Sequence, residues 1–409
     1  MEIRKTCIQV FLAELAITLV LVFSYLFIYE ARPPSALTPD IQSEIQFKHQ
    51  DGFWNKRILT NVIQYKSGRV ISDENLENIK IISVNQCKNR RFLMYKCDGA
   101  SLCGGMGDRQ KGIISTFLLS LLTNRTFVLD MTKPCKVEAG LLPGVYNWSL
   151  CKEHIKSLPK KEYLKLNLMF GNRSYAKEIE NFDFDNQWTA KVVLIRCNTM
   201  LIDKISRHNY TKTRISWLLD TTIEETIHKV LHTLFQPNQR ILEDFVKLYN
   251  NHVQGKHLVC SHIRIGKNPT LPKDNRLLRG APNSTKILEF LKRYDDSEKF
   301  AIYIATDSDA VRKDAESNLT SYVNINRPIV HVDRRMNESV AEACEGLYTG
   351  IFEQFILSVC DTIVLTRSNF GCMAAYMRGV SDNIFMYNPA SREVEQYNLT
   401  DIQRVFKFF

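Results

Sequence analysis

The chain lacks the short motifs that define several common classes of protein. It contains no C-x-x-C pair and no histidine-rich companion for one, which argues against a structural zinc site. It has neither G-x-G-x-x-G nor a glycine-lysine-serine/threonine loop, so a standard dinucleotide site and a P-loop are both excluded. There is no internal repeat or low-complexity tract. The basic residues form no stripe with interleaved aromatics, so nucleic acid is not an expected partner.

The composition is that of a globular protein with a basic balance. Of the 409 residues, 44% are hydrophobic and 24% are charged, and this length suits one large or two medium domains. The formal net charge is +10 and the isoelectric point is near 9.0. Such a balance favours acidic partners, among them nucleotides and phosphates.

The N-terminus carries one long hydrophobic run. Arg4 and Lys5 precede an apolar stretch at 10–29, which is long enough to cross a bilayer. Glu14 would cost about 2.5–3.5 kcal/mol at the bilayer centre, but it lies near the cytosolic end of the run. No small-x-small cleavage site follows. We therefore predict a type II membrane protein with a cytosolic tail at 1–9, an uncleaved transmembrane signal anchor at 10–29 and a stem at 30–78. A cleaved signal peptide is the alternative.

This orientation places the rest of the chain in the secretory lumen, and two further features agree. Asn-x-Ser/Thr sequons, which are candidate glycosylation sites, occur at Asn124, Asn147, Asn172, Asn209, Asn283, Asn318, Asn337 and Asn398. The ten cysteines beyond the anchor form an even set, which favours disulfides in this compartment, although the sequence leaves their pairing open. No K-D-E-L-type signal closes the sequence, so we predict a Golgi membrane location, with the endoplasmic reticulum as the alternative.

Hydrophobic patterning predicts an α/β fold with two Rossmann-like domains, at 79–250 and 251–409, facing a cleft. In the first domain we predict strands at 91–95, 126–130 and 191–196, a glycine loop at 103–109, a helix at 113–122, loops and helices at 135–189, two helices over 220–248 broken at Pro237, and a hinge at 250–256. In the second we predict strands at 258–263, 300–306, 329–332, 362–366 and 383–387, and helices at 284–294, 309–318, 339–360 and 371–377. Such alternation implies a parallel sheet with right-handed crossovers.

Three predicted strands of the second domain end in polar residues. These are H-x-R-x-G at 262–266, T-D-S at 306–308, and S-N-F-G at 368–371, where a serine or asparagine can cap the next helix. Ligands bind beyond the carboxyl ends of the strands in an open α/β sheet. An arginine there provides a fork for phosphate, and a helix N-terminus provides free N–H groups. Together these segments predict a site for a nucleoside diphosphate.

The same segments resemble the motifs of the GT-B fucosyltransferase superfamily, which includes protein O-fucosyltransferases, α1,6-fucosyltransferases and plant cell-wall fucosyltransferases. H-I-R-I-G at 262–266, A-T-D-S at 305–308 and S-N-F-G at 368–371 are similar to three of its motifs, and G-M-G-D-R at 105–109 is similar to its N-terminal glycine loop. The resemblance covers most of 85–390 but is strong only in these patches. It implies a GT-B architecture and an inverting, metal-independent fucosyltransferase without a cofactor. Such an enzyme moves fucose from GDP-fucose to a glycan or glycoprotein acceptor.

The resemblance also implies roles for individual residues. Arg264 would hold the β-phosphate and stabilise the departing diphosphate, and Asp108 is a catalytic candidate near the sugar. The implied donor-binding residues are Gly105, Met106, Gly107, Arg109, His262, Gly266, Thr306, Asp307, Ser368, Asn369 and Phe370. The first domain would lie on the acceptor side, and the second would bind the nucleotide sugar. Ile265, Lys267 and Asn369 depart from the family pattern, and the acceptor, its linkage and the catalytic base stay open.

Three other interpretations remain. Asp307-x-Asp309 is also a D-x-D pattern, which in a metal-dependent glycosyltransferase would ligate Mn²⁺. Asp309 is equally suited to the first turn of the following helix. A Golgi sulfotransferase would share the anchor, the sequons and the charge, but its nucleotide-phosphate loop is missing. A catalytically inactive, glycan-binding relative would keep the fold; the intact Arg264, Asp307 and Ser368 argue against it.

Overall fold

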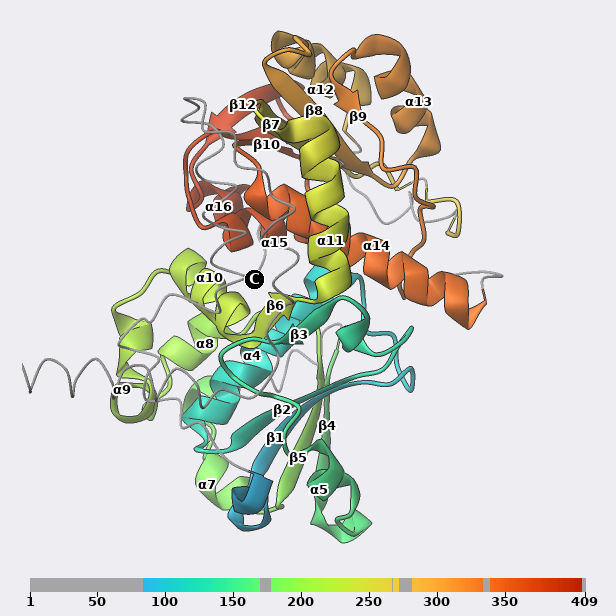
Figure 1. The fold of residues 1–409 in the computed structure, drawn as a ribbon. Coiled ribbons are helices and arrows are strands. Elements are labelled where there is room, and N and C mark those ends of the chain that lie inside the picture. Colours follow the sequence, from blue (N-terminus) through green and yellow to red (C-terminus); the bar gives the residue numbers. More distant parts are fainter. Residues whose placement is uncertain (1–83, 170–177, 267, 272–281, 334–338, 407–409) are drawn as a thin grey trace, which may run out of the picture. The chain divides into compact units, whose positions relative to one another are not determined.

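The first sheet of the chain has four strands, all parallel. The computed structural model describes residues 84–169, 178–266, 268–271, 282–333 and 339–406. The strands are β1 (Phe92–Cys97), β2 (Thr126–Met131), β4 (Tyr163–Leu168) and β5 (Val192–Cys197), in the order β2-β1-β5-β4. Helix α4 (Met106–Leu122) packs against β1, β2 and β5 (Figure 1). The two central strands are buried on both faces, which explains why they read as continuous apolar runs.

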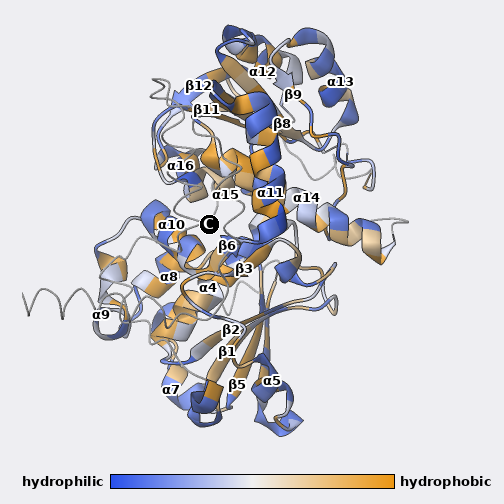
Figure 2. Ribbon diagram, viewed as in Figure 1, coloured by the Kyte–Doolittle hydropathy of each residue, from blue (hydrophilic) through white to orange (hydrophobic). Residues whose placement is uncertain are grey.

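The second sheet has six strands and is parallel except at one edge. In sheet order its strands are β12 (Glu393–Tyr397), β11 (Ile384–Asn388), β10 (Thr362–Leu365), β7 (His257–Ile263), β8 (Phe300–Thr306) and β9 (Tyr322–Val323). Only the pairing of β11 with β12 is antiparallel. The central strand β7 is buried at every position. Hydrophobic residues concentrate on the strands and on α4, whereas α13 is largely hydrophilic (Figure 2).

The helices of the second half are α12 (Ser284–Leu291), α13 (Asp309–Asn318), α14 (Val340–Val359), α15 (Asn369–Arg378) and α16 (Asp401–Phe406). Those of the first half after α4 are α5 (Lys152–Lys156), α7 (Phe184–Gln187), α8 (Ile202–Ser206), α9 (Thr211–Arg214), α10 (Ile223–Leu234) and α11 (Gln239–Leu248), with a π-helical turn at Tyr249–Val253. The first half also contains a short antiparallel pair of strands, β3 (Leu141–Pro143) and β6 (Phe235–Pro237). 3₁₀ turns occur at Val84–Asn89, Val137–Ala139, Lys160–Glu162, Ile179–Asn181, Ser216–Leu219 and Lys292–Tyr294.

Several contacts join the two halves of the described chain. A disulfide links Cys135 to Cys344. Gln110 on α4 and Gln354 on α14 exchange amide hydrogen bonds of 2.7 and 3.0 Å inside the core. Helices α4 and α10 also pack against α15. All described residues belong to one contact-defined unit, so the predicted domain boundary near residue 250 stays a prediction.

The structure corrects the predicted elements in four places. Residues 329–332 do not form a strand, and the edge strand β9 comes earlier, at Tyr322–Val323. The segment predicted as loops and helices over the first sheet contributes β4 to the sheet itself. Helix α4 begins at Met106 instead of residue 113, so half of the predicted glycine loop is helical. The antiparallel strand β12 was not predicted at all.

The cysteines pair less completely than predicted. The described disulfides are Cys87–Cys151, Cys97–Cys103, Cys135–Cys344 and Cys260–Cys360. Cys197 and Cys372 are instead buried free thiols, so an even count did not imply complete pairing. The predicted tail, anchor and stem lie outside the described residues. Within the described part of the chain, none of the helices has the length and hydrophobicity that a membrane span requires.

Candidate active site

A cavity of about 620 Å³ lies at the carboxyl edge of the second sheet. Its walls come from the ends of β7 and β8, the β10–α15 turn, the segment 328–332 and one face of α14, and from the first turn of α4 in the other half. This volume lies within the range of small-molecule sites. The predicted site residues that line the cavity are Gly105, Met106, Gly107, Asp108, His262, Arg264, Thr306, Asp307, Ser368, Asn369 and Phe370.

Arg264 is held in a fixed position at the end of β7. Its guanidinium Nη1 donates to the carboxylate of Asp307, which follows β8. That carboxylate also accepts the backbone N–H groups of Ile265 and Gly266, each at 2.7 Å. On the other side, the hydroxyl of Thr366 accepts the N–H of Arg264 at 2.8 Å. Asp307 therefore positions both the arginine and the turn that carries it.

Three buried polar groups in the cavity wall have no hydrogen-bond partner among the described residues. They are Nδ1 of His262, Oγ1 of Thr306 and Oγ1 of Thr349. These residues are only 6%, 6% and 4% exposed. Leaving a buried donor or acceptor unsatisfied costs about 1–3 kcal/mol, so such groups require an explanation. These atoms lie behind the cavity surface, and His262 Nδ1 lies against the backbone of Gly371.

The first turns of α4 and α15 meet at the cavity. Asn369 donates its side-chain amide to Asp108 Oδ1 at 2.5 Å, and Lys111 Nζ lies 3.2 Å from the same oxygen. Ser368 is the N-cap of α15, as predicted, and its hydroxyl accepts the N–H of Phe370 at 3.3 Å. The N-terminus of α15 therefore opens into the same cavity as Arg264. This arrangement suits an anion.

The structure adds cavity residues that sequence reasoning missed. Glu353 lies one turn after Thr349 on α14, accepts the hydroxyl of Tyr303 at 3.1 Å and lies 3.6 Å from Arg312. Burial raises its pKa from 4.5 to about 7, although Arg312 opposes the shift. Arg367, immediately before the cap of α15, is exposed and also lines the cavity. The available signal for Glu353 was its spacing of one helical turn from Thr349 in a helix whose second half is largely buried.

Two residues predicted to bind the donor do not line the cavity. Arg109 is 0% exposed, and its guanidinium is directed to backbone carbonyls and to Asp333. Helix α4 begins at Met106, so Arg109 lies in its first turn, and its side chain makes these contacts outside the cavity wall. Gly266 is buried with φ of +79° and serves the turn that Asp307 holds.

The D-x-D interpretation does not fit the geometry of its two acids. Asp307 is 7% exposed and is engaged with Arg264 and the backbone, whereas Asp309 is exposed in the first turn of α13 and does not line the cavity. Among the described residues, no group of three histidine, cysteine or acidic side chains is placed to hold a metal ion. Asp309 therefore has the position of an ordinary first-turn acid.

The sequons can be compared with the surface. The exposed asparagines among them are Asn124, Asn147, Asn209, Asn283, Asn318 and Asn398. Asn172 and Asn337 lie outside the described residues. The asparagine of every described sequon is therefore exposed, while glycosylation itself stays a prediction.

Acid is expected to destabilise the fold through its buried histidines. Burial lowers the pKa of His232, His257 and His262 from 6.5 to about 4. The folded state then binds fewer protons than the unfolded state, so stability is complete above pH 6.5 and is lost as the pH falls toward 4. Glu353 acts oppositely, because its raised pKa favours the folded state as the pH falls from 7. Three groups outweigh one.

Urea unfolding at pH 7 and pH 5 tests this prediction. Each histidine whose effect Glu353 does not offset should lower the free energy of unfolding by about 1.4 kcal/mol per pH unit below pH 6.5. His232→Gln, which lies outside the cavity of Arg264, should make the free energy of unfolding less dependent on pH. Equal free energies of unfolding at the two pH values would contradict the assignment.

Comparison with known proteins gives a match in structure only. No family model matches the chain, and no curated protein matches its sequence. The fucosyltransferase FUT1 of Arabidopsis thaliana, solved as a mutant in complex with GDP, matches with a TM-score of 0.52. The match covers 83% of this chain and 80% of that one, at 14% identity. In fold, this chain resembles a fucosyltransferase.

A second fucosyltransferase gives a weaker match. The α1,6-fucosyltransferase NodZ from Bradyrhizobium, in a crystal soaked with GDP-fucose, has a TM-score of 0.49 at 13% identity. That match covers 76% of this chain and 99% of NodZ. The match to FUT1 and the two largely parallel sheets confirm the predicted architecture of two Rossmann-like halves for the described residues.

Proposed function

We propose that this protein is a fucosyltransferase that uses GDP-fucose as its donor. The observation that carries the proposal is the cavity in which Arg264, fixed by Asp307, lies with the N-terminus of α15. The fold that the chain shares with FUT1, which was solved with GDP, supports it. The cavity wall holds four cationic side chains against three carboxylates, which favours an anionic ligand; they are Lys111, Arg264, Arg312 and Arg367, and Asp108, Asp307 and Glu353.

The cavity wall also includes a carboxylate that suits a guanine base. The carboxylate of Glu353 can accept hydrogen bonds, and guanine offers an exocyclic amino group and a ring N–H side by side, a pair that uracil lacks. This chemistry favours a guanosine donor over a uridine donor.

In the proposed reaction, the bond between C1 of fucose and the β-phosphate oxygen breaks. A bond forms between C1 and an acceptor hydroxyl oxygen on the opposite face of the sugar, so the configuration at C1 inverts. Arg264 and the N–H groups of α15 stabilise the negative charge on the departing GDP. Asp108, held by Asn369 and Lys111, is the candidate that takes the hydroxyl proton, and the acceptor is a glycan or glycoprotein.

The proposal includes the anchor and the compartment. The predicted span at 10–29 would hold the enzyme in the Golgi membrane as a type II protein, with the described residues in the lumen. The exposed sequons and the four disulfides are compatible with that compartment. A shift in mobility after enzymatic removal of N-glycans would support it, and an unglycosylated cytosolic protein would contradict it.

Initial rates of nucleotide release test the activity. The full-length protein, purified in detergent, is given GDP-fucose, GDP-mannose or UDP-galactose with a pool of glycoprotein acceptors. We expect GDP-fucose to be turned over fastest and fucose to appear in the acceptor. Preference for the uridine donor would contradict the proposal. GDP binding without transfer would favour the inactive relative, and loss of activity on exhaustive chelation would favour the metal-dependent alternative.

A further inference from the structure

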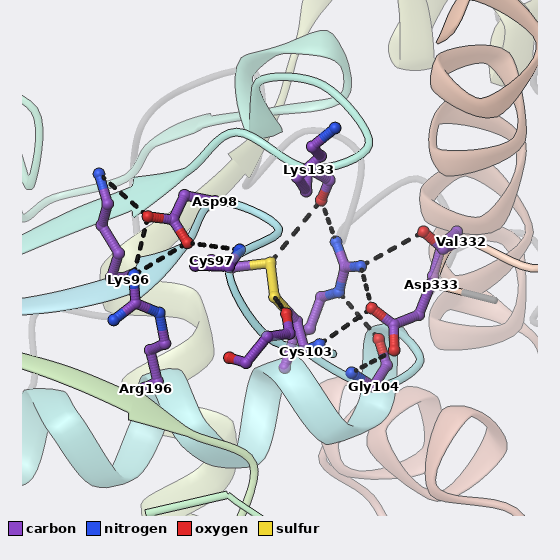
Figure 3. Close-up of a disulfide and its surroundings, with 12 residues drawn as sticks. Lys96, Cys97, Asp98, Cys103, Gly104, Lys133, Arg196, Val332 and Asp333 are labelled. Carbon is purple, nitrogen blue, oxygen red and sulfur yellow. Dashed lines mark hydrogen bonds and ion pairs between the residues drawn. A yellow bond between two sulfur atoms is a disulfide. The ribbon is translucent and has the colours of Figure 1, made fainter. Parts of the chain in front are cut away.

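A carboxylate from the second half holds the glycine loop of the first half. Asp333 follows the cavity segment 328–332, and its side chain is 8% exposed. Its two oxygens accept the backbone N–H groups of Cys103 and Gly104, at 2.9 and 3.0 Å (Figure 3). The two halves of the chain are therefore joined at the entrance to α4 by bonds to the backbone itself.

Arg109 completes this arrangement from within α4. Its Nε donates to the carbonyl of Gly104 at 2.9 Å, and Nη1 donates to the carbonyl of Lys133. Nη2 lies 3.4 Å from the carbonyl oxygen of Val332 and 3.5 Å from Oδ1 of Asp333. The carboxylate of Asp333 therefore accepts the N–H of Gly104, and the guanidinium of Arg109 donates to its C=O. Gly104 has a φ of +86°, which is readily accessible to glycine.

A disulfide holds the same loop from the opposite side. Cys97, the last residue of β1, forms a disulfide with Cys103. This disulfide closes the short segment between the two cysteines into a ring. Figure 3 shows this disulfide between Asp98, which pairs with Lys96 and Arg196, and Asp333 on its other side. Cys103 is therefore fixed both to the first sheet and to the second half.

None of these holding groups lines the cavity, but the residues that follow them do. Asp333, Arg109, Cys103 and Gly104 lie outside the cavity wall, whereas Gly105 to Asp108 form part of it. The N–H groups of Cys103 and Gly104 already have a carboxylate partner, so a phosphate would have to use other donors. The glycine loop thus contributes to the cavity only through its later residues, including the carboxylate of Asp108.

We propose that Asp333 is a positioning residue that sets the glycine loop and Asp108 for the transfer step. This inference rests on the proposed fucosyltransferase function. Asp333 acts through the amides of Cys103 and Gly104, and touches neither donor nor acceptor. Misplacing a reacting group by about 1 Å can cost about 10²-fold in rate. Loss of the carboxylate should therefore slow turnover and leave nucleotide affinity intact.

The kinetic test compares the isosteric change Asp333→Asn with a matched control. Asp361→Asn alters another buried carboxylate of the second half, one that accepts the N–H of Leu258 at 2.8 Å and does not line the cavity. In Asp333→Asn we expect kcat to fall about 10–100-fold, with the Kd for GDP within about twofold of wild type. Asp361→Asn should leave both unchanged. A kcat within twofold of wild type in Asp333→Asn would overturn the proposal.

A double variant shows whether Asp333 acts through Asp108. If it does, Asp108→Asn combined with Asp333→Asn should be no slower than Asp108→Asn alone, because the positioned group is already gone. Rate losses that multiply would overturn this route and leave Asp333 with a merely structural role.

Hydrogen exchange tests the contact without any activity assay. In the wild-type protein, the amides of Cys103 and Gly104 should exchange more slowly than their neighbours in the loop. In Asp333→Asn their protection should be lost while that of the β1 amides is kept. Fast exchange of the two amides in the wild type, or equal loss across the first sheet, would overturn the proposal. If the wild type transfers no fucose but shows this protection, the proposed function fails and the positioning contact stands.

Discussion

Replacing Arg264 with lysine should slow fucose transfer almost as much as replacing it with alanine. The guanidinium is planar, and one of its nitrogens is already bonded to Asp307, so its remaining N–H groups point in fixed directions. A lysine ammonium would also pair with Asp307, but it would leave no second, oriented donor for the departing diphosphate. Removing one such donor typically costs about 10²–10³ in rate, and we expect both variants in that range.

The matched control for this prediction is Arg240→Lys. Arg240 is half-exposed on α11, pairs with Glu345 at 2.7 Å and does not line the cavity. Its replacement should leave the initial rate of transfer unchanged. Wild-type transfer by Arg264→Ala would remove the arginine from the mechanism, and an active Arg264→Lys would show that charge alone suffices.

Two neighbouring glycines at the cavity should respond very differently to alanine. A Cβ on Gly107 would lie 2.5 Å from the carbonyl carbon of Asn369 and 2.7 Å from the backbone nitrogen of Phe370. These are backbone atoms in the first turn of α15, so they cannot move without shifting the helix and the cavity wall. A Cβ on Gly105, with φ of −63°, would meet nothing within 4 Å.

We therefore expect Gly107→Ala to lower the free energy of unfolding by about 1–3 kcal/mol and to impair GDP binding. The gain in helix propensity from alanine, about 1 kcal/mol, does not offset this overlap. Gly105→Ala, at the N-cap of α4, should cost no more than about 1 kcal/mol and should weaken GDP binding less than Gly107→Ala does. Urea unfolding and GDP titration of the two variants measure the difference. Equal behaviour would show that α4 and α15 are not packed this closely.

The cavity of Arg264 could be predicted from the sequence because parallel strands end at one edge of their sheet. Arg264, Asp307 and Ser368 each follow a buried strand, so topology alone brings them together. Of the two capping candidates, Ser368 is the N-cap, and α15 begins at Asn369, two residues before the predicted start. Local signals sufficed wherever a site residue lies next to the end of an element.

Other features depend on contacts between distant segments, which no local pattern encodes. Val330 and Val332 look like a short apolar strand, but they form an irregular part of the cavity wall, and Val330 contacts α14. Arg109 lies within a family-like motif, yet its direction is set by Asp333, which is far along the chain. The free thiol of Cys372 is likewise a matter of three-dimensional position, since an even cysteine count cannot show which thiols meet.

Calorimetric titration with GDP, performed on the wild-type protein and on Arg264→Ala, is the most direct test of whether Arg264 forms part of a GDP-binding site. We expect the wild type to bind GDP more tightly than UDP and GMP, and the variant to bind GDP far more weakly while its affinity for GMP changes little. Equal affinity of the two proteins for GDP, or a wild-type preference for UDP, would contradict a guanosine diphosphate site built around this arginine.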